Sequence, residues 1–201
     1  MLTKKQLAIQ LSKLQIFEKP KLKLEQYPTD SEAAATVLWD AYMKGDIANK
    51  KIVDLGAGTG ILGVGALLLG AEYVYFVEKD FDAIQVLRQN LYTLRNKNYT
   101  VLQMDVTEFS EHVDIVLQNP PFGTKQEHAD KPFLEKAFSI ATVMYSFHKT
   151  TTESFVVAIA RDHLFTVVEK LSFSFPLRQS YAHHQKKIQR IEVTCFRMVK
   201  C

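Results

Sequence analysis

The sequence is poor in cysteine, and its two cysteines, Cys195 and Cys201, both lie near the C-terminal end. This pattern excludes a disulfide framework, so we expect free thiols in a reducing compartment. No grouping of cysteine, histidine and acidic residues has the spacing of a metal site, and we therefore expect no bound metal.

Long hydrophobic runs are also missing. The longest apolar-rich stretch, residues 61–71, is interrupted by three glycines. A membrane-spanning helix needs about 20 apolar residues, so we expect none. The N-terminal residues also lack the core of roughly 7–15 apolar residues that a secretory signal peptide contains. We therefore expect a cytoplasmic protein that does not associate with a membrane.

Composition and length are those of a soluble globular chain. The sequence is 47% hydrophobic and 23% charged, which excludes wholesale disorder. Its 201 residues fit one domain, at about 150 residues per domain. The net charge of +3 is uneven, because residues 1–25 carry +4, residues 178–201 carry +5 and the remainder carries −6. Two basic ends suit a polyanionic partner if they meet in the fold, whereas solvated surface lysines are the other interpretation.

Strands alternate with helices from residue 51 onward. We expect seven strands, over residues 52–55, 73–78, 99–103, 113–117, 154–160, 171–177 and 191–199. We expect helices over residues 2–14, 30–43, 61–70, 80–95, 131–147 and 162–170. This alternation predicts an α/β fold with a Rossmann-like, doubly wound, mostly parallel seven-stranded sheet, in which a terminal hairpin adds one antiparallel strand. We expect one domain over residues 1–201, with N-terminal helices in residues 1–48 and the Rossmann-like core in residues 49–201.

A glycine-rich turn follows the first predicted strand. It holds an acid and three glycines at alternate positions: Asp54, Gly56, Gly58 and Gly60. Glycine lets the backbone approach a ligand closely, here at a helix N-terminus with free N–H groups. Glu78 ends the next strand, where a carboxylate can accept hydrogen bonds from both ribose hydroxyls of an adenosine. The glycines also match a dinucleotide fingerprint, so a dehydrogenase stays open, although the strand-end Asp54 disfavours it.

Polar residues also follow the third and fourth predicted strands. Asp105 can accept a hydrogen bond from an adenine amino group, although a solvated or capping aspartate gives the same pattern. The tetrapeptide Asn119-Pro120-Pro121-Phe122 is a turn stiffened by two prolines. The Asn119 side-chain carbonyl and the Pro120 backbone carbonyl can converge on one NH₂ group, and Phe122 can stack on an unstacked base. The pattern favours methylation of a planar amine through alignment, without a protein nucleophile.

With these motifs the chain resembles class I S-adenosylmethionine-dependent methyltransferases that carry an Asn-Pro-Pro-Phe or Asn-Pro-Pro-Tyr motif. Further strings resemble the family of enzymes that make N6-methyladenosine in small-subunit ribosomal RNA: residues 17–22, 24–29, 54–56, 119–125 and 145–149. This resemblance spans nearly the whole chain. It implies S-adenosylmethionine as cofactor, structured RNA (ribosomal RNA above all) as substrate, and a small zinc-binding activator subunit as partner.

The resemblance also implies roles for individual residues. Gln26 and Thr29 match a lid over the cofactor. The other positions that match cofactor contacts are Asp54, Gly56, Gly58, Thr59, Gly60, Ile61, Glu78, Asp105, Val106 and Asn119. The catalytic motif comprises Asn119, Pro120, Pro121 and Phe122. Thr59 departs from relatives that carry cysteine, and Glu78 from relatives that carry aspartate. The activator subunit would dock on the predicted edge strand, Tyr99–Gln103.

Basic residues near the predicted site are candidates for contact with RNA phosphates. They are Lys125, His148, Lys149, Lys186, Lys187 and Arg190. For each of them a solvated surface position is the alternative.

The leading prediction is methyl transfer to adenine N6 of structured RNA. A protein glutamine methylase uses a similar turn, but usually with tyrosine at the fourth position and with an extra helical domain. A non-catalytic RNA-binding module with this fold is the alternative from another class, and the presence of both Asn119 and Glu78 argues against it.

Overall fold

The computed structural model describes residues 2–17, 21, 29–123, 129–177 and 189–201. Its strands are β1 (Lys51–Leu55), β2 (Tyr73–Glu78), β3 (Tyr99–Gln103), β4 (Ile115–Gln118), β5 (Val143–Lys149), β6 (Phe165–Leu177) and β7 (Gln189–Lys200). Its helices are α1 (Lys4–Leu11), α2 (Ser31–Met43), α3 (Ile61–Leu68), α4 (Phe81–Tyr92), η2 (Val106–Glu108), α5 (Lys131–Ile140), η3 (Thr150–Thr152) and α6 (Glu153–Asp162).

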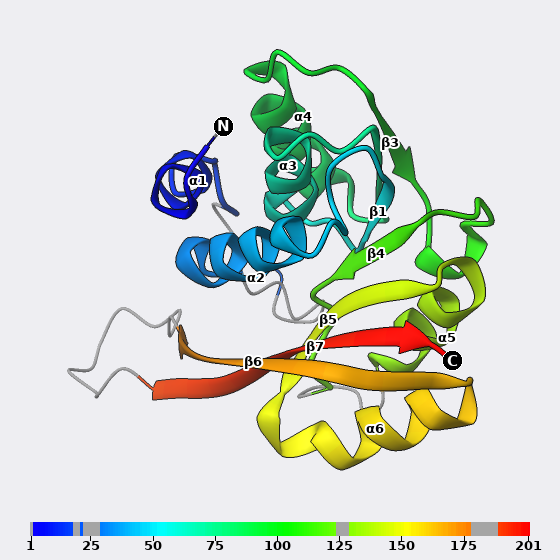
Figure 1. Cartoon of the computed structure of the whole chain (residues 1–201). Helices are drawn as coiled ribbons and strands as arrows, with labels where there is room; N and C mark the ends of the chain where they lie inside the picture. The colour runs from blue at the N-terminus through cyan, green and yellow to red at the C-terminus, as the bar shows by residue number, and fades with distance from the viewer. Residues whose placement is uncertain (1, 18–20, 22–28, 124–128, 178–188) are drawn as a thin grey trace.

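All seven strands form one sheet in the order β3-β2-β1-β4-β5-β7-β6 (Figure 1). Strands β1 to β5 pair in parallel, whereas β7 is antiparallel to both β5 and β6. The predicted α/β class and the seven-stranded, mostly parallel sheet with one antiparallel strand are therefore confirmed, although not every strand lies at the residues expected. The prediction that Tyr99–Gln103 is an edge strand is also confirmed, because β3 ends the sheet.

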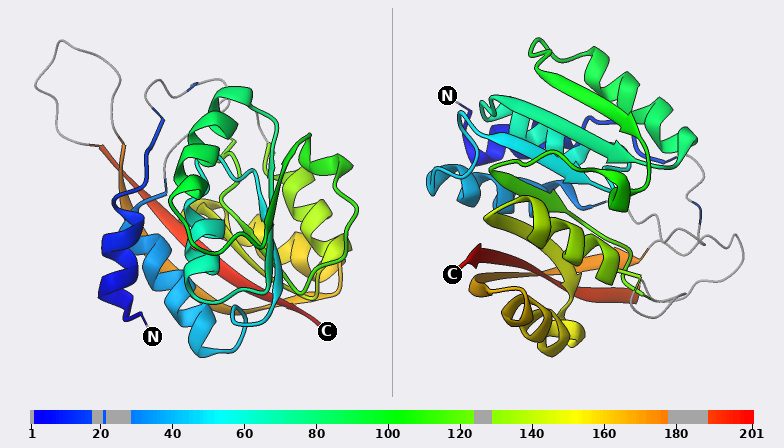
Figure 2. Two further views of the ribbon diagram at one scale, coloured as in Figure 1. Left: turned by 90° about the horizontal axis from the view of Figure 1, so that it is seen from above. Right: turned by 90° about the vertical axis from the view of Figure 1, so that its right-hand side faces the viewer.

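Helices cover both faces of the sheet (Figure 2). The layer of α1, α2, α3 and α4 shares one buried cluster with alternate residues of the central strands, such as Ile52 and Leu117. The layer of η2, α5 and α6 shares the other cluster with the residues between them, such as Val53 and Val116. This alternation follows from the two-residue period of a strand, and it makes both sheet faces interior.

The first long helix begins and ends as its sequence predicts. The Asp30 side chain caps α2 by accepting hydrogen bonds from the N–H groups of Glu32 and Ala33, both at 3.0 Å. Gly45 follows the helix with a φ of +80°, a left-handed conformation that glycine adopts at little cost.

The predictions over residues 131–170 are wrong in three places. The helix expected over 131–147 ends at Ile140, and residues 143–149 form β5. This central strand is buried almost throughout, so it lacks the alternation that marks a strand. The strand expected over 154–160 is α6, whose buried residues Val156, Ile159 and Ala160 have helical spacing. The helix expected over 162–170 gives way to β6, which begins at Phe165.

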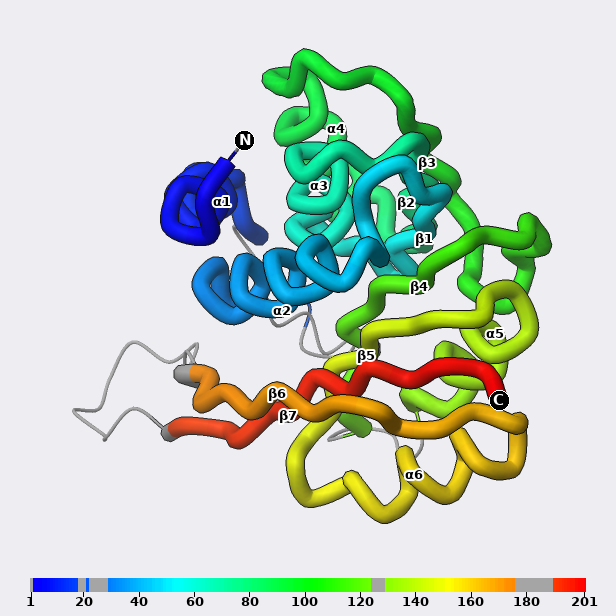
Figure 3. Tube along the Cα trace, viewed as in Figure 1, coloured from blue at the N-terminus to red at the C-terminus, as the bar shows by residue number. Residues whose placement is uncertain are grey.

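The carboxyl ends of the parallel strands lie at one edge of the sheet. Since β6 and β5 both run opposite to β7, the end of β6 and the start of β7 lie at that same edge (Figure 3). Loops at this edge are where doubly wound sheets bind ligands. Among the described residues, no helix combines the length and apolar character needed to cross a membrane. The expected cytoplasmic location stays a prediction.

Candidate functional site

The turn after β1 has a backbone conformation that favours glycine. Gly56, Gly58 and Gly60 have φ angles of +68°, +55° and +91°. Gly60 is the N-cap of α3, and a Cβ atom added there would collide with the Leu87 side chain of α4. The N–H groups of Gly56 and Gly60 donate to the Val77 and Ala57 carbonyls, so these bonds hold the turn in a fixed shape.

Asp54 holds this turn against the first turn of α3. The side chain is buried at 2% exposure, and its Oδ2 accepts a hydrogen bond from the Gly63 N–H at 2.8 Å. Burial raises the pKa of Asp54 to about 7. Thr59 is also buried, and Ile61 begins α3.

The predicted ribose acid lies beside the glycine turn. Glu78 Oε2 accepts a hydrogen bond from the Gly58 N–H at 2.9 Å, and Oε1 accepts one from the Asp80 N–H at 2.8 Å. This contact requires the parallel pairing of β1 with β2, which aligns Leu55 with Val77.

Asp105 lies where β3 ends, one strand further along. Its Oδ1 accepts hydrogen bonds from the N–H and the hydroxyl of Thr107, at 3.1 and 2.9 Å. The Thr107 N–H, aided by Lys79, lowers the pKa of this carboxyl. Asp105 thus caps η2, which begins at Val106. The capping interpretation of Asp105 is confirmed, and its contact with an adenine amino group stays a prediction.

The Asn-Pro-Pro-Phe turn leaves β4 beside this glycine turn. Asn119 donates a hydrogen bond from Nδ2 to Thr29 Oγ1 at 2.8 Å, which ties it to the residues just before α2. Among the described residues, the buried Oδ1 of Asn119 has no hydrogen-bond partner. Pro120 is buried, and Phe122 is 9% exposed and belongs to the larger hydrophobic cluster.

Asn90, a buried residue of α4, also contacts the glycine turn and was not among the predicted site residues. Its Nδ2 donates to the Thr59 carbonyl at 2.9 Å and to the Gln15 carbonyl at 3.0 Å, and its Oδ1 accepts from the Gln15 N–H at 2.8 Å. Asn90 therefore joins the glycine turn to the segment after α1. The signal was a polar residue on the buried face of α4, next to Leu87 and Leu91.

The prediction that His148 contacts RNA is wrong, because its side chain is buried at 1% exposure. The ring is covered by Asp130 of the α5 N-terminus and by Phe196 of β7, which the local sequence does not reveal. Lys149 is half-buried and Arg190 is exposed, near the ligand edge of the sheet. Gln26, Lys125, Lys186 and Lys187 lie outside the described residues.

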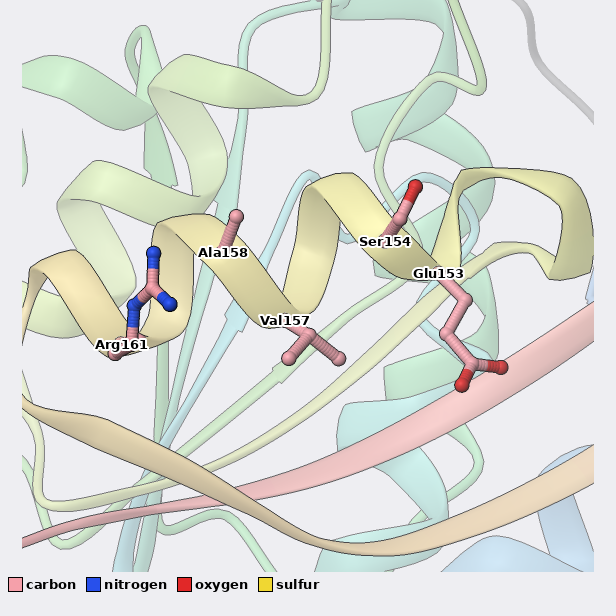
Figure 4. Close-up of a pocket in the computed structure, with 5 residues that line it drawn as sticks. All are labelled: Glu153, Ser154, Val157, Ala158 and Arg161. Carbon is pink, nitrogen blue, oxygen red and sulfur yellow. The ribbon is translucent and has the colours of Figure 1, made fainter.

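A surface hollow elsewhere contains none of the predicted site residues. Its lining comes from one helix, α6: Glu153, Ser154, Val157, Ala158 and Arg161 (Figure 4). A single helix face without facing elements is a weak candidate for a ligand site. In the part of the chain that the structure describes, no three acidic, cysteine or histidine residues gather as a metal site.

The family model for the methyltransferase small domain matches residues 30–144. The chain belongs to this family, and its sheet order and glycine turn are those of a class I methyltransferase, an S-adenosylmethionine-dependent enzyme. The structure of the magnesium protoporphyrin IX methyltransferase of Synechocystis with bound S-adenosylmethionine shows the same fold, at 15% identity and a TM-score of 0.67, over 85% of this chain and 79% of that one.

More similar relatives cover nearly the whole chain. The zebrafish rRNA N(6)-adenosine-methyltransferase METTL5 is 36% identical over 96% of this chain and 97% of its own. The Drosophila melanogaster rRNA N(6)-adenosine-methyltransferase Mettl5 is 36% identical over 90% of this chain and 89% of its own. A crystal structure of a Pyrococcus horikoshii protein, described as a candidate RNA methyltransferase, is 47% identical with a TM-score of 0.90, over 98% of both chains.

Proposed function

We propose that the chain transfers a methyl group from S-adenosylmethionine to N6 of adenine in structured RNA, with small-subunit ribosomal RNA as substrate. The observation that carries the proposal is the unpartnered, buried Oδ1 of Asn119 among the described residues. A buried acceptor without a donor costs about 1–3 kcal/mol, which a donor from a bound substrate would offset. The names of the zebrafish and fly relatives support adenosine of ribosomal RNA as that substrate.

The residues around the glycine turn fit the cofactor, which supplies an electrophilic methyl group when bound. Gly56 and Gly58 have no side chains, but the rings of Phe133 and Phe17 lie beside them, so these rings must move before the amino acid part can reach the backbone. Glu78 offers two carboxylate oxygens to the ribose hydroxyls, and Asp105 offers one to the adenine amino group. Glu78 and Asp105 now accept backbone hydrogen bonds, which they would share with these donors.

Asn119 and Pro120 orient the substrate amine. An aromatic amine is a poor nucleophile because its lone pair is delocalised into the ring. Two acceptors, Asn119 Oδ1 and the Pro120 carbonyl, would take its two N–H hydrogens and direct the lone pair away from the ring plane. Thr29 prevents rotation of the Asn119 amide, since it occupies Nδ2 and leaves Oδ1 for the substrate. Because Phe122 is 9% exposed, its ring can stack on a base only after the turn moves.

Activity further depends, we propose, on a small zinc-binding activator subunit that pairs with β3. The support is the resemblance together with the position of β3 at the end of the sheet. Its residues Tyr99, Thr100, Val101 and Leu102 are only half-buried, as expected of a strand that can accept another.

The test is methyl transfer from radiolabelled S-adenosylmethionine into unmodified ribosomal RNA, DNA and a glutamine-containing peptide, with and without the activator subunit. We expect N6-methyladenosine in RNA alone. Asn119→Ala should abolish transfer while S-adenosylmethionine still binds. Gln89→Ala, which removes an exposed amide from α4, is the matched control and should leave transfer intact.

Other outcomes separate the alternatives. Label in the peptide alone would make the chain a glutamine methylase. Retained turnover in Asn119→Ala would remove this residue from catalysis. RNA binding without label in either arm of the assay would favour a non-catalytic RNA-binding module.

A further inference from the structure

A buried chain of four polar side chains lies behind the Asn-Pro-Pro-Phe turn, on the α5 face of the sheet. Gln118 Nε2 donates to Ser146 Oγ at 2.9 Å. Ser146 Oγ lies 2.6 Å from His148 Nε2, and His148 Nδ1 lies 3.0 Å from Asp130 Oδ2. The four residues are between 0% and 7% exposed, so water does not compete for these bonds.

The hydrogen bonds of this chain all point in one direction. The Gln118 amide nitrogen can only donate and the Asp130 carboxylate can only accept. With a neutral imidazole between them, Ser146 donates to His148 Nε2. His148 then carries its proton on Nδ1 and donates it to the Asp130 carboxylate. Hydrogen bonds aligned in this way polarise one another. Among the described residues, the buried Gln118 Oε1 has no partner, so the network is satisfied from Gln118 Nε2 to Asp130 but not at this oxygen.

The hydrogen-bonded chain begins and ends at the two residues that flank the candidate catalytic loop. Gln118 is the last residue of β4 and precedes Asn119, whereas Asp130 directly precedes α5. Ser146 pairs with Gln118 across the parallel strands, and His148 is the next residue on the same face of β5. The hydrogen-bonded chain therefore joins Gln118, which precedes Asn119, to Asp130, which precedes α5.

The side chains of Asp130 and Ser146 serve this hydrogen-bonded chain and have no other evident role. Asp130 is the N-cap residue of α5, yet its side chain makes no capping hydrogen bond to that helix. A Ser-His-Asp order also occurs in hydrolases, but there the serine must reach the substrate. Ser146 is 0% exposed, which excludes that role.

We propose that Asp130, Ser146 and His148 are positioning residues that hold Asn119 and Pro120 in register with the methyl donor. The inference rests on the proposed function of the Asn-Pro-Pro-Phe turn. Its physical basis is that methyl transfer by alignment tolerates little displacement, and a shift of about 1 Å can reduce a rate about 100-fold.

The central test is Ser146→Ala, which breaks the chain by removing one oxygen. Its matched control is Tyr145→Phe, which removes one buried oxygen from the neighbouring residue of the same strand. The Tyr145 hydroxyl faces the other layer, where it donates to Asp46 at 2.7 Å. Both variants remove a buried hydrogen bond, but only Ser146→Ala removes one that reaches the loop.

We expect Ser146→Ala to lower kcat about 10- to 100-fold, as a displaced reacting group would. The dissociation constant of S-adenosylmethionine should not change. Deuterium uptake by the peptide over residues 119–123 should accelerate. Tyr145→Phe should change neither kcat nor this uptake. Asp130→Asn, which keeps an acceptor oxygen for His148, should retain more activity than Asp130→Ala.

The results of these variants distinguish a failure of the positioning role from a failure of the proposed function. If Asn119→Ala abolishes turnover but Ser146→Ala does not reduce kcat, the positioning role is wrong and the function stands. If Tyr145→Phe reduces kcat as much as Ser146→Ala, the loss reflects stability and the positioning role is also wrong. If the wild type methylates no RNA, the function fails, and unchanged deuterium uptake in Ser146→Ala would overturn the positioning role independently.

Discussion

Two buried polar clusters lie on opposite faces of β5, and adjacent residues of that strand begin them. On one face, Tyr145 and Arg197 share Asp46 Oδ2, at 2.7 and 2.9 Å. On the other face, Ser146 belongs to the chain that ends at Gln118 and Asp130. The first cluster joins β5 and β7 to the turn after α2, whereas the second joins the two ends of the candidate catalytic loop.

The two clusters have similar chemistry and differ in location. We expect the location to decide whether a substitution affects stability alone or also methyl transfer. Both clusters consist of hydrogen-bonded groups, although Gln118 Oε1 has no partner among the described residues, so removing one of the hydrogen bonds in either cluster should cost stability. Only the second contacts the segment to which the proposed function assigns the alignment of the substrate amine. Variants of the Asp46 cluster should therefore change the free energy of unfolding alone.

Asp54 is a third buried carboxylate, in addition to Asp46 and Asp130. Among the described residues, Asp54 has no ion-pair partner. Burial raises its pKa from 3.8 to about 7, so the folded state binds more protons than the unfolded state between these values. Stability is therefore lost as the pH rises from 4 to 7, by about 4 kcal/mol at about 1.4 kcal/mol per pKa unit. Asp54→Asn, which keeps an acceptor for Gly63, should remove this loss.

Urea unfolding at pH 5 and pH 7.5 measures the effect as a difference between wild type and variant. Asp114→Asn, at an exposed aspartate that accepts the Lys51 N–H, is the control. Equal pH dependence in the two variants would show that Asp54 ionises at low pH in the folded protein.

Asp46→Ala should destabilise the protein by about 3 kcal/mol, because it leaves the Arg197 guanidinium and the Tyr145 hydroxyl without their acceptor. Chemical unfolding measures this loss. Glu153→Ala breaks the exposed ion pair with Lys170 and should cost at most about 1 kcal/mol. Faster deuterium uptake over residues 119–123 in Asp46→Ala would contradict the expectation that only the Ser146 face of β5 affects the candidate catalytic loop.

The strands from β1 to β4 and the glycine turn were predictable because their signals are local. Each short strand is followed by a glycine, an acid or a proline turn that marks its end. The positions of Asp54, Glu78 and Asn119 at one edge of the sheet follow directly from a parallel fold.

The region from β5 to β6 was less predictable because its secondary structure and burial depend on residues that are distant in the sequence. His148 and Lys149 look like a surface pair in the sequence, yet β7 and the α5 N-terminus bury the histidine. Asp130 and His148 are separated by a helix and most of a strand, so no spacing rule connects them. The polar chain behind the loop therefore emerges only from the structure.

The smallest expected effect is the coupling between the two clusters. Tyr145 and Ser146 are adjacent in sequence, but they share no hydrogen-bond partner. In a double-mutant cycle, the stability losses of Tyr145→Phe and Ser146→Ala should add to within about 0.5 kcal/mol. The double variant should show the kcat of Ser146→Ala alone. A larger coupling energy would mean that β5 transmits strain between its faces, and the control variant would then no longer isolate the loop.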